Sequence, residues 1–250
     1  MKFAKAAIAL SAGFALGCAS NAQGETAHWT YRGHGGPSEW GTLSQEFANC
    51  RIGRNQSPID IHDAKVADLP PIRFDYKPSP LAVIDTGHTI QLNYAPGSSI
   101  DLGGVRYELV QFHFHKPSEE KIDGKSHPMV AHLVHKSADG RLAVVAVLLD
   151  AGGTSAMIDE IWKNLPKQKE KETLVQNVTI DATDLLPKQR GYYTFQGSLT
   201  TPPCSEEVTW LVLKTPVKIA AAAVAKFGKI YPMNARPVQP VNGRSILTTR

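Results

Sequence analysis

Short runs of apolar residues, some of them alternating with polar ones, recur along most of this chain. Gly, Pro, Asn and Asp separate the runs, and because these residues favour turns, the pattern predicts many short strands and few helices. The predicted strands cover residues 82–84, 89–94, 107–116, 129–136, 142–149 and 208–213. Ser155 can cap a helix that runs to about Asn164, and the alanine-rich segment 219–227 favours a second helix that ends near Gly228.

The chain shows no internal repeat, low-complexity tract or linker. With 250 residues and 42% hydrophobic content it can bury one full core, and sheet-rich domains of this size commonly form a single unit. We therefore expect one domain.

The first 22 residues have the features of an export signal. Lys2 and Lys5 precede the apolar run 6–16, which is too short to span a bilayer comfortably, and Ser20-Asn21-Ala22 supplies the small residues of a cleavage site. We expect residues 1–22 to be removed on export to the periplasm or the medium, leaving residues 23–250 as the mature domain without a transmembrane span.

Cys18 leaves a second form of export open. The segment Leu16-Gly17-Cys18 allows lipid attachment at Cys18, although Ala15 argues against it because such motifs usually carry a larger aliphatic residue there.

Removal of the signal takes away two lysines, so the formal net charge falls from +4 to +2 (4 − 2). A nearly neutral domain gives no indication of nucleic-acid binding.

Histidines on two predicted strands form a candidate metal site. His113 and His115 point to the same side of a strand, with Cα atoms roughly 6.5 to 7 Å apart, and on the strand 129–136 His132 shares a face with Val134. Three imidazoles are the ligand set of a catalytic zinc site. Alternating histidines are also found as hydrogen-bonded core or surface residues, so their spacing alone does not decide between these interpretations.

Several sequence motifs resemble the alpha-class carbonic anhydrases, from about His28 to the C-terminus. They are the histidine strand and the segments 28–31, 36–41, 56–61, 197–204 and 234–240, which read HWTY, GPSEWG, QSPIDI, GSLTTPPC and NARPVQP. The resemblance implies an α+β, mainly β fold, in which a single domain is built on a central twisted, mostly antiparallel sheet flanked by short helices.

The same resemblance implies a Zn²⁺ cofactor held by His113, His115 and His132. Zinc with three neutral ligands and an open fourth position ionises a bound water near pH 7, an effect for which carbonic anhydrase is the standard example. The expected reaction is the reversible hydration of carbon dioxide to bicarbonate and a proton by zinc-bound hydroxide. Thr200 and Glu119 match the family's gatekeeping pair, in which the threonine hydroxyl accepts a hydrogen bond from the hydroxide and donates one to the glutamate.

Other matching positions carry expectations about proton transfer and the substrate. His88 matches the proton shuttle, a role suited to an imidazole with a pKa near 6.5, and Tyr31 matches a member of the water network. Carbon dioxide has no net dipole, so its pocket should be apolar. The matching substrate positions are Val134, Val144, Leu199, Thr201, Val208 and Trp210.

Residues that orient zinc ligands show one departure from the family pattern. Gln111 matches the side-chain acceptor for His113, and the backbone near Asn234 matches the acceptor for His115. Two positions before His132 the family normally carries a glutamate, whereas this chain has Val130. Loss of such a partner costs about 10- to 100-fold in metal affinity or activity, so we expect faster zinc release unless water or another acceptor substitutes.

Cys50 and Cys204 are the cysteines of the mature domain. In an oxidising compartment they would pair, and the resemblance supports the same disulfide. In a reducing cytosol they would instead be two buried thiols.

Two other functions remain open at this point. The first is a carbonic-anhydrase-like zinc-binding protein with weak or no catalysis, towards which Val130 leans. The second is a zinc hydrolase for a larger substrate, which a small apolar pocket disfavours. The expected partner is a small molecule, carbon dioxide or bicarbonate, and the expected state is a monomer or a homodimer.

Overall fold

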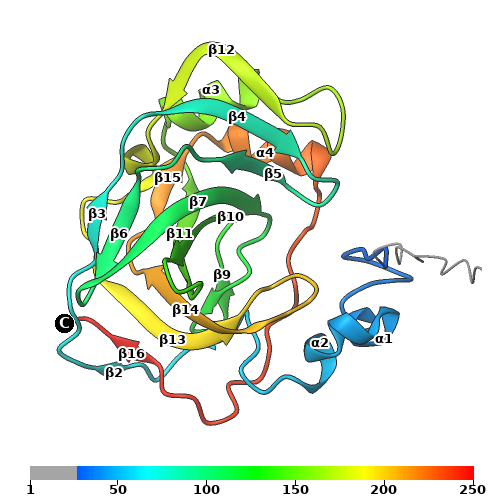
Figure 1. The fold of residues 1–250 in the computed structure, drawn as a ribbon, viewed down its shortest axis with the longest axis vertical. Coiled ribbons are helices and arrows are strands. Elements are labelled where there is room, and N and C mark those ends of the chain that lie inside the picture. The colour runs from blue at the N-terminus through cyan, green and yellow to red at the C-terminus, as the bar shows by residue number, and fades with distance from the viewer. Residues whose placement is uncertain (1–26) are drawn as a thin grey trace, which may run out of the picture.

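A twisted 13-stranded sheet runs through the domain and curves around its centre (Figure 1). The computed structural model describes residues 27–250, so the expected export signal and Cys18 lie outside the described residues. The main path of the sheet has the following order: β12 (Thr173–Ile180), β4 (Ser79–Asp85), β5 (Ile90–Asn93), β7 (Val105–His115), β10 (Met129–Ser137), β11 (Leu142–Ala151), β14 (Glu206–Leu213), β13 (Tyr192–Ser198), β16 (Leu247–Thr248) and β2 (Lys65–Val66).

Three more strands join this sheet away from its main path. β15 (Val217–Ile219) pairs with β11, while β6 (Ser99–Leu102) pairs with both β7 and β3 (Arg73–Asp75). Most neighbours are antiparallel, but β11 runs parallel to β14 and β15, and β16 runs parallel to β2. A separate small sheet contains β1 (Asp60–Ile61), β8 (Lys121–Ile122) and β9 (Lys125–Ser126). The predicted fold class is therefore confirmed.

Short helices flank the sheet, as expected. They are α1 (Trp40–Leu43), α2 (Asn49–Ile52), α3 (Ala156–Lys163) and α4 (Ala221–Ile230), with 3₁₀ turns at Gln45–Phe47 and Ala182–Leu185. Ser155 caps α3 as predicted, since its hydroxyl accepts a hydrogen bond from the Ile158 amide at 3.3 Å.

The predicted limits of the second helix were wrong. It begins after the strand β15 and ends at Ile230, so Gly228 lies inside the helix and does not terminate it. A Cβ atom at Gly228 would lie 3.0 Å from Cε of Lys116. This glycine therefore leaves room for a side chain that comes from another part of the chain.

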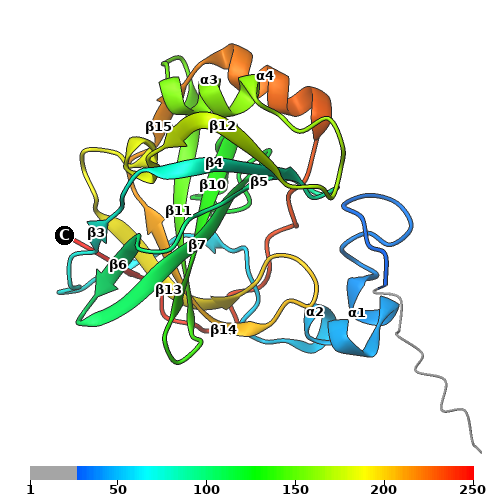
Figure 2. The same ribbon diagram turned by 45° about the horizontal axis from the view of Figure 1, so that its top comes forward.

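Alternation along the central strands separates a hydrophobic core from a polar site. Phe112 and Phe114 of β7 enter the larger core, and Phe114 meets Trp162 of α3 edge-on with ring centroids 5.0 Å apart. The helices α3 and α4 lie together over this side of the sheet (Figure 2). The histidines between and after these phenylalanines face the opposite side, where His132 of β10 meets Trp210 of β14.

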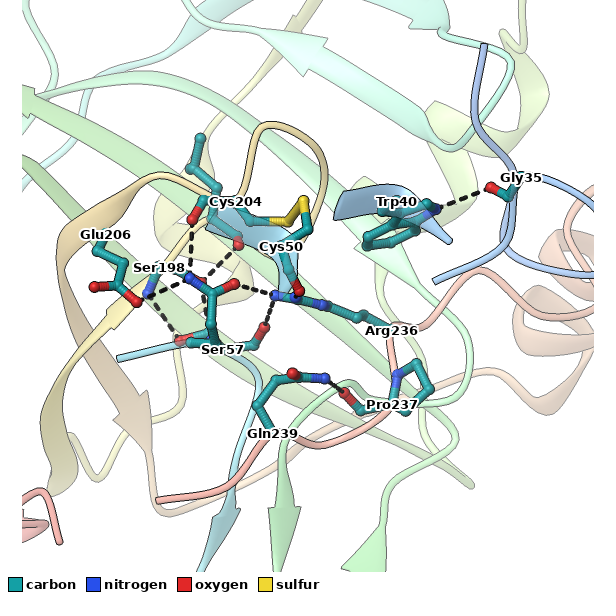
Figure 3. The surroundings of a disulfide bond; sticks show 12 residues. Gly35, Trp40, Cys50, Ser57, Ser198, Cys204, Glu206, Arg236, Pro237 and Gln239 are labelled. Carbon is teal, nitrogen blue, oxygen red and sulfur yellow. Dashed lines mark hydrogen bonds between the residues drawn. A yellow bond between two sulfur atoms is a disulfide. The ribbon is translucent and has the colours of Figure 1, made fainter. Parts of the chain in front are cut away.

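The expected disulfide joins α2 to the loop between β13 and β14. Figure 3 shows the bond between Cys50 and Cys204, with Trp40 nearby. Together with Trp40 and Phe47, the two cysteines form a small apolar cluster. The end of β13, just before this loop, lies close to the segment that precedes β1: the amide of Ser57 donates to the Ser198 hydroxyl, and the amide of Ser198 donates to the Ser57 hydroxyl. Gly197 is needed for this approach, because a Cβ there would lie 2.1 Å from the Ser57 hydroxyl oxygen.

None of the helices in residues 27–250 is long and apolar enough to cross a membrane.

We predict that loss of the disulfide destabilises the domain without changing its fold. The bond closes a loop of 154 positions, and removal of a native disulfide typically costs about 2 to 5 kcal/mol. The double substitution Cys50→Ala/Cys204→Ala should lower the urea midpoint of unfolding, and a reductant should lower that of the wild type but not that of the variant. An unchanged midpoint in the double variant would contradict this prediction.

Candidate metal centre and active site

Three histidines from two neighbouring strands come together at the centre of the sheet. β7 carries His113 and His115, β10 carries His132, and the antiparallel register sets His132 directly opposite His113. One ring nitrogen from each lies within 4.8 Å of the others. His115 and His132 are buried, and His113 is partly exposed. The structure thus brings together the three residues that the strand pattern and the resemblance selected.

The hydrogen-bond partners of the rings decide which nitrogens are left to face one another. Nδ1 of His113 donates to Oε1 of Gln111 at 2.8 Å, and Nδ1 of His115 donates to the carbonyl oxygen of Asn234 at 2.7 Å. These acceptors cannot donate, so the hydrogen is on Nδ1 in both rings and Nε2 carries the free lone pair. Nε2 of His115 is buried and has no hydrogen-bond partner in residues 27–250. Such nitrogens fit a metal ion.

Another acceptor substitutes for the glutamate that is missing at position 130, an alternative that the sequence left open. Nε2 of His132 lies 2.9 Å from Oε1 of Glu120, which leaves Nδ1 to face the other two histidines. Val130 is fully buried in an apolar cluster with Ile59 and Ile61. The acceptor therefore comes from the turn before β8, a segment for which the strand pattern made no statement.

Burial keeps two of the three rings neutral. It lowers the pKa of His113 to about 3 and holds the pKa of His115 well below its ordinary value. Burial also lowers the pKa of His132, but the carboxylates of Glu120 and Glu119 oppose it, and the net direction is upward. A neutral imidazole is the form that binds a metal, so the sheet presents His113 and His115 ready to act as ligands.

Glu119 lies beside this cluster in a fully buried position. Its Oε2 atom is 3.5 Å from Nε2 of His115, and its Oε1 atom accepts the backbone N–H of Arg236 at 2.7 Å. Burial raises the pKa of the Glu119 carboxyl to about 7, while the nearby Thr200 hydroxyl lowers it. Thr200 and Glu119, the predicted pair, are therefore neighbours.

An apolar cluster borders the histidines on the side of β14. Trp210 meets the ring of His132 edge-on at 4.9 Å and donates its indole N–H to the carbonyl of Ser198. The remaining apolar residues expected at the substrate pocket belong to the same cluster: Val134, Val144, Leu199 and Val208. Thr201 follows Thr200, and its carbonyl accepts the amide of Cys204.

His88 lies at the surface, in the turn between β4 and β5. Its ring stacks on Trp29 with centroids 3.7 Å apart, and Tyr31 lies edge-on at 6.4 Å. It lines one surface hollow with Trp29 and Tyr31, and another with Trp29 and Pro202, close to the Thr200 loop. Partial burial lowers the pKa of His88, and the nearby His28 lowers it further.

Asn234 joins the His88 turn to the metal centre. Besides accepting from His115 through its carbonyl oxygen, it donates from Nδ2 to the carbonyl of His88 at 3.0 Å and accepts the Lys116 amide through Oδ1 at 2.8 Å. The sequence resemblance pointed to the backbone here and missed the side chain.

Arg236 was also missed, although it belongs to a motif that resembles the family. Its guanidinium is buried and donates to Gln56, to the carbonyl of Ser57 and to the carbonyl of Cys50. Figure 3 shows the side chain directed towards the disulfide, with Trp40 alongside. Its backbone, in turn, holds Glu119.

Known proteins are similar to this chain in both sequence and fold. The eukaryotic-type carbonic anhydrase family profile matches residues 35–250. A carbonic anhydrase of Nostoc sp. is 43% identical over 95% of this chain and 92% of its own length, and one of Neisseria gonorrhoeae is 46% identical over 90% of each. The structure of the alpha-carbonic anhydrase of Thermovibrio ammonificans with the inhibitor sulfanilamide covers 89% of this chain and 100% of that one, at a TM-score of 0.86 and 41% identity.

Because the family match extends over most of the chain and the relatives are aligned over nearly their whole length, this chain belongs to the eukaryotic-type, or alpha, carbonic anhydrase family and is a carbonic anhydrase.

Proposed function

We propose that this chain catalyses the reversible hydration of carbon dioxide to bicarbonate and a proton with Zn²⁺ held by His113, His115 and His132. The observation that carries the proposal is the set of three converging imidazole nitrogens, each aimed by an acceptor on the other nitrogen of its ring. Zinc held by three neutral ligands supplies a hydroxide nucleophile near pH 7.

Thr200 and Glu119 orient the nucleophile in this proposal. Oε1 of Glu119 is occupied by the Arg236 amide, whereas Oε2 has no hydrogen-bond partner within the described residues. Oε2 is therefore the atom to which we assign the hydrogen bond donated by the Thr200 hydroxyl. The threonine oxygen is then left to accept a hydrogen bond from the nucleophile. This contact would orient the nucleophile towards the carbon atom of carbon dioxide.

The apolar cluster beside His132 provides the place for carbon dioxide. A linear molecule without a dipole gains nothing from polar partners, so side chains that exclude water favour its binding over that of ions. Val134, Val144, Leu199, Val208 and Trp210 supply this surface, and Thr201 lies at its edge.

His88 accepts the proton that hydration releases. Its lowered pKa keeps the imidazole mostly neutral at pH 7, which is the form that takes up a proton. The stacked Trp29 holds the ring at the surface, where it can pass the proton to solvent, and Tyr31 lies edge-on to His88 in the same hollow.

Export is part of this proposal. The Cys50–Cys204 disulfide supports an oxidising compartment, such as the periplasm or the medium. A binding protein without catalysis is not favoured, because the missing partner of His132, which had suggested it, is supplied by Glu120.

Removal of one ligand should abolish both zinc binding and activity. We expect His115→Ala to hold less than one zinc per chain and to hydrate carbon dioxide at the buffer rate, since two imidazoles leave the ion weakly held. Stopped-flow hydration and zinc content on the same sample test this, with chelator-stripped wild type for comparison and the exposed His62→Ala as the matched control. Full activity of wild type after complete zinc removal would overturn the proposal.

Loss of the Thr200 hydroxyl should slow hydration without releasing zinc. We expect Thr200→Val to lower kcat/KM by on the order of 100-fold, because the nucleophile loses its fixed orientation. Thr200→Ser keeps the hydroxyl and should retain most of the activity. Equal rates for the valine and serine variants would contradict the role of this hydroxyl.

Replacement of His88 should affect proton transfer alone. In weakly buffered solution we expect His88→Ala to lower kcat by on the order of 10- to 100-fold. The loss is smaller than for most catalytic acids and bases because water can also carry the proton away. The value of kcat/KM should stay unchanged, and added imidazole should restore kcat. In the wild type the contribution of His88 is present above its lowered pKa and is lost as the pH falls through it, because the protonated ring cannot accept. A variant with normal kcat at low buffer concentration would exclude this role.

A further inference from the structure

Glu120 is a buried carboxylate that neither the family resemblance nor the proposed mechanism assigns to a task. It is 0% exposed, and its Oε1 atom lies 2.9 Å from Nε2 of His132. Burial of a carboxylate is costly unless a cation or hydrogen-bond donors compensate it. The other oxygen, Oε2, has no partner in the part of the chain that the structure describes. The contact with His132 is therefore the interaction that must compensate the burial of the Glu120 carboxylate.

The backbone of Glu120 is held independently of the strand that carries His132. Its carbonyl oxygen accepts the Ser118 hydroxyl at 2.8 Å, and the amide of the next residue, Lys121, donates to the carbonyl of Ile59 at the start of the β1–β8 pairing. Ser118 is itself fixed, because its hydroxyl accepts the amide of His127 at 2.9 Å. The carboxylate thus approaches His132 from a firmly held turn.

Val130 completes the arrangement. Residues two apart on a strand face the same side, so position 130 lies beside His132 on β10 and is where an acceptor from the same strand would stand. In this chain that position is apolar and packs with Ile59 and Ile61, next to the backbone that holds Glu120. The carboxylate that contacts Nε2 of His132 comes from the turn, not from the strand, while Oε2 of Glu119 lies 3.8 Å from Nδ1 on the other side of the ring.

We propose that Glu120 is the positioning residue for the third zinc ligand, and that it replaces an acceptor at position 130. This inference rests on the zinc site proposed above. Glu120 holds the His132 ring with Nδ1 towards the metal position, and as a carboxylate it makes this ligand more strongly donating than the other two, whose partners are the neutral oxygens of Gln111 and Asn234. Glu120 therefore sets how long zinc is retained.

The test is zinc release from the loaded mature protein into excess chelator, followed with a zinc-sensitive dye. We expect release to become faster in the order wild type, Glu120→Gln, Glu120→Leu, reaching about 10- to 100-fold for Glu120→Leu. Glutamine keeps the shape and a neutral acceptor, so it separates charge from packing. Glu108→Gln, an exposed glutamate on β7, is the matched control and should release zinc at the wild-type rate.

A second variant distinguishes positioning from general packing. In Glu120→Leu/Val130→Glu the acceptor is moved to the strand, and we expect zinc release to return towards the wild-type rate. Val130→Glu alone should not slow release, because it adds a further buried carboxylate beside Glu119 and Glu120. Wild-type release rates in both single Glu120 variants, or a double variant no slower than Glu120→Leu, would overturn the inference. A wild type that binds no zinc would instead overturn the proposed function.

Discussion

The register between β7 and β10 is the constraint on which the site depends. It sets His132 opposite His113, so that three ring nitrogens converge. A slip of one residue would turn every side chain of one strand to the other face, moving histidines into the core and apolar residues into the site. Phe114 of β7 opposes such a slip because it is packed against Trp162 of α3 and Phe227 of α4, and Phe112 packs against Phe114. The same packing that stabilises the fold therefore positions the three histidines.

Buried charge connects the metal centre to distant parts of the chain. Glu119 and Glu120 are both buried beside the histidines, and a cation held there, as in the proposed zinc site, would compensate them. The backbone of Arg236 holds Glu119, and its guanidinium holds the carbonyl oxygens of Ser57 and Cys50. The disulfide loop, the segment before β1 and the C-terminal segment thus meet at one polar network. Figure 3 shows how closely these three segments approach one another.

The three histidines are held by three different kinds of partner. Gln111 is a side chain on the same strand, Asn234 contributes a backbone carbonyl from near the C-terminus, and Glu120 contributes a carboxylate from a turn. Gln111 lies two residues before His113 on the same strand, so the alternation of side chains places both on one face. The other two need the chain to return to the site from elsewhere. The hydrogen-bond partners of the histidines therefore come from more widely separated parts of the chain than the histidines themselves.

The sequence by itself determined the strands β4, β5, β7, β10, β11 and β14 and the face on which His113, His115 and His132 lie. Together with the family resemblance it also indicated the pairing of Cys50 with Cys204, whereas the other strands were not predicted. Alternation with a period of two is a local property, and the motifs are contiguous, so both can be read from the chain. The tertiary structure alone decided that Glu120 serves His132, that Asn234 uses its side chain as well as its backbone, and that Gly228 lies within a helix. Each of these depends on which segments meet after folding, and no local pattern records contacts made across 12, 146 or 112 positions (132 − 120, 234 − 88, 228 − 116).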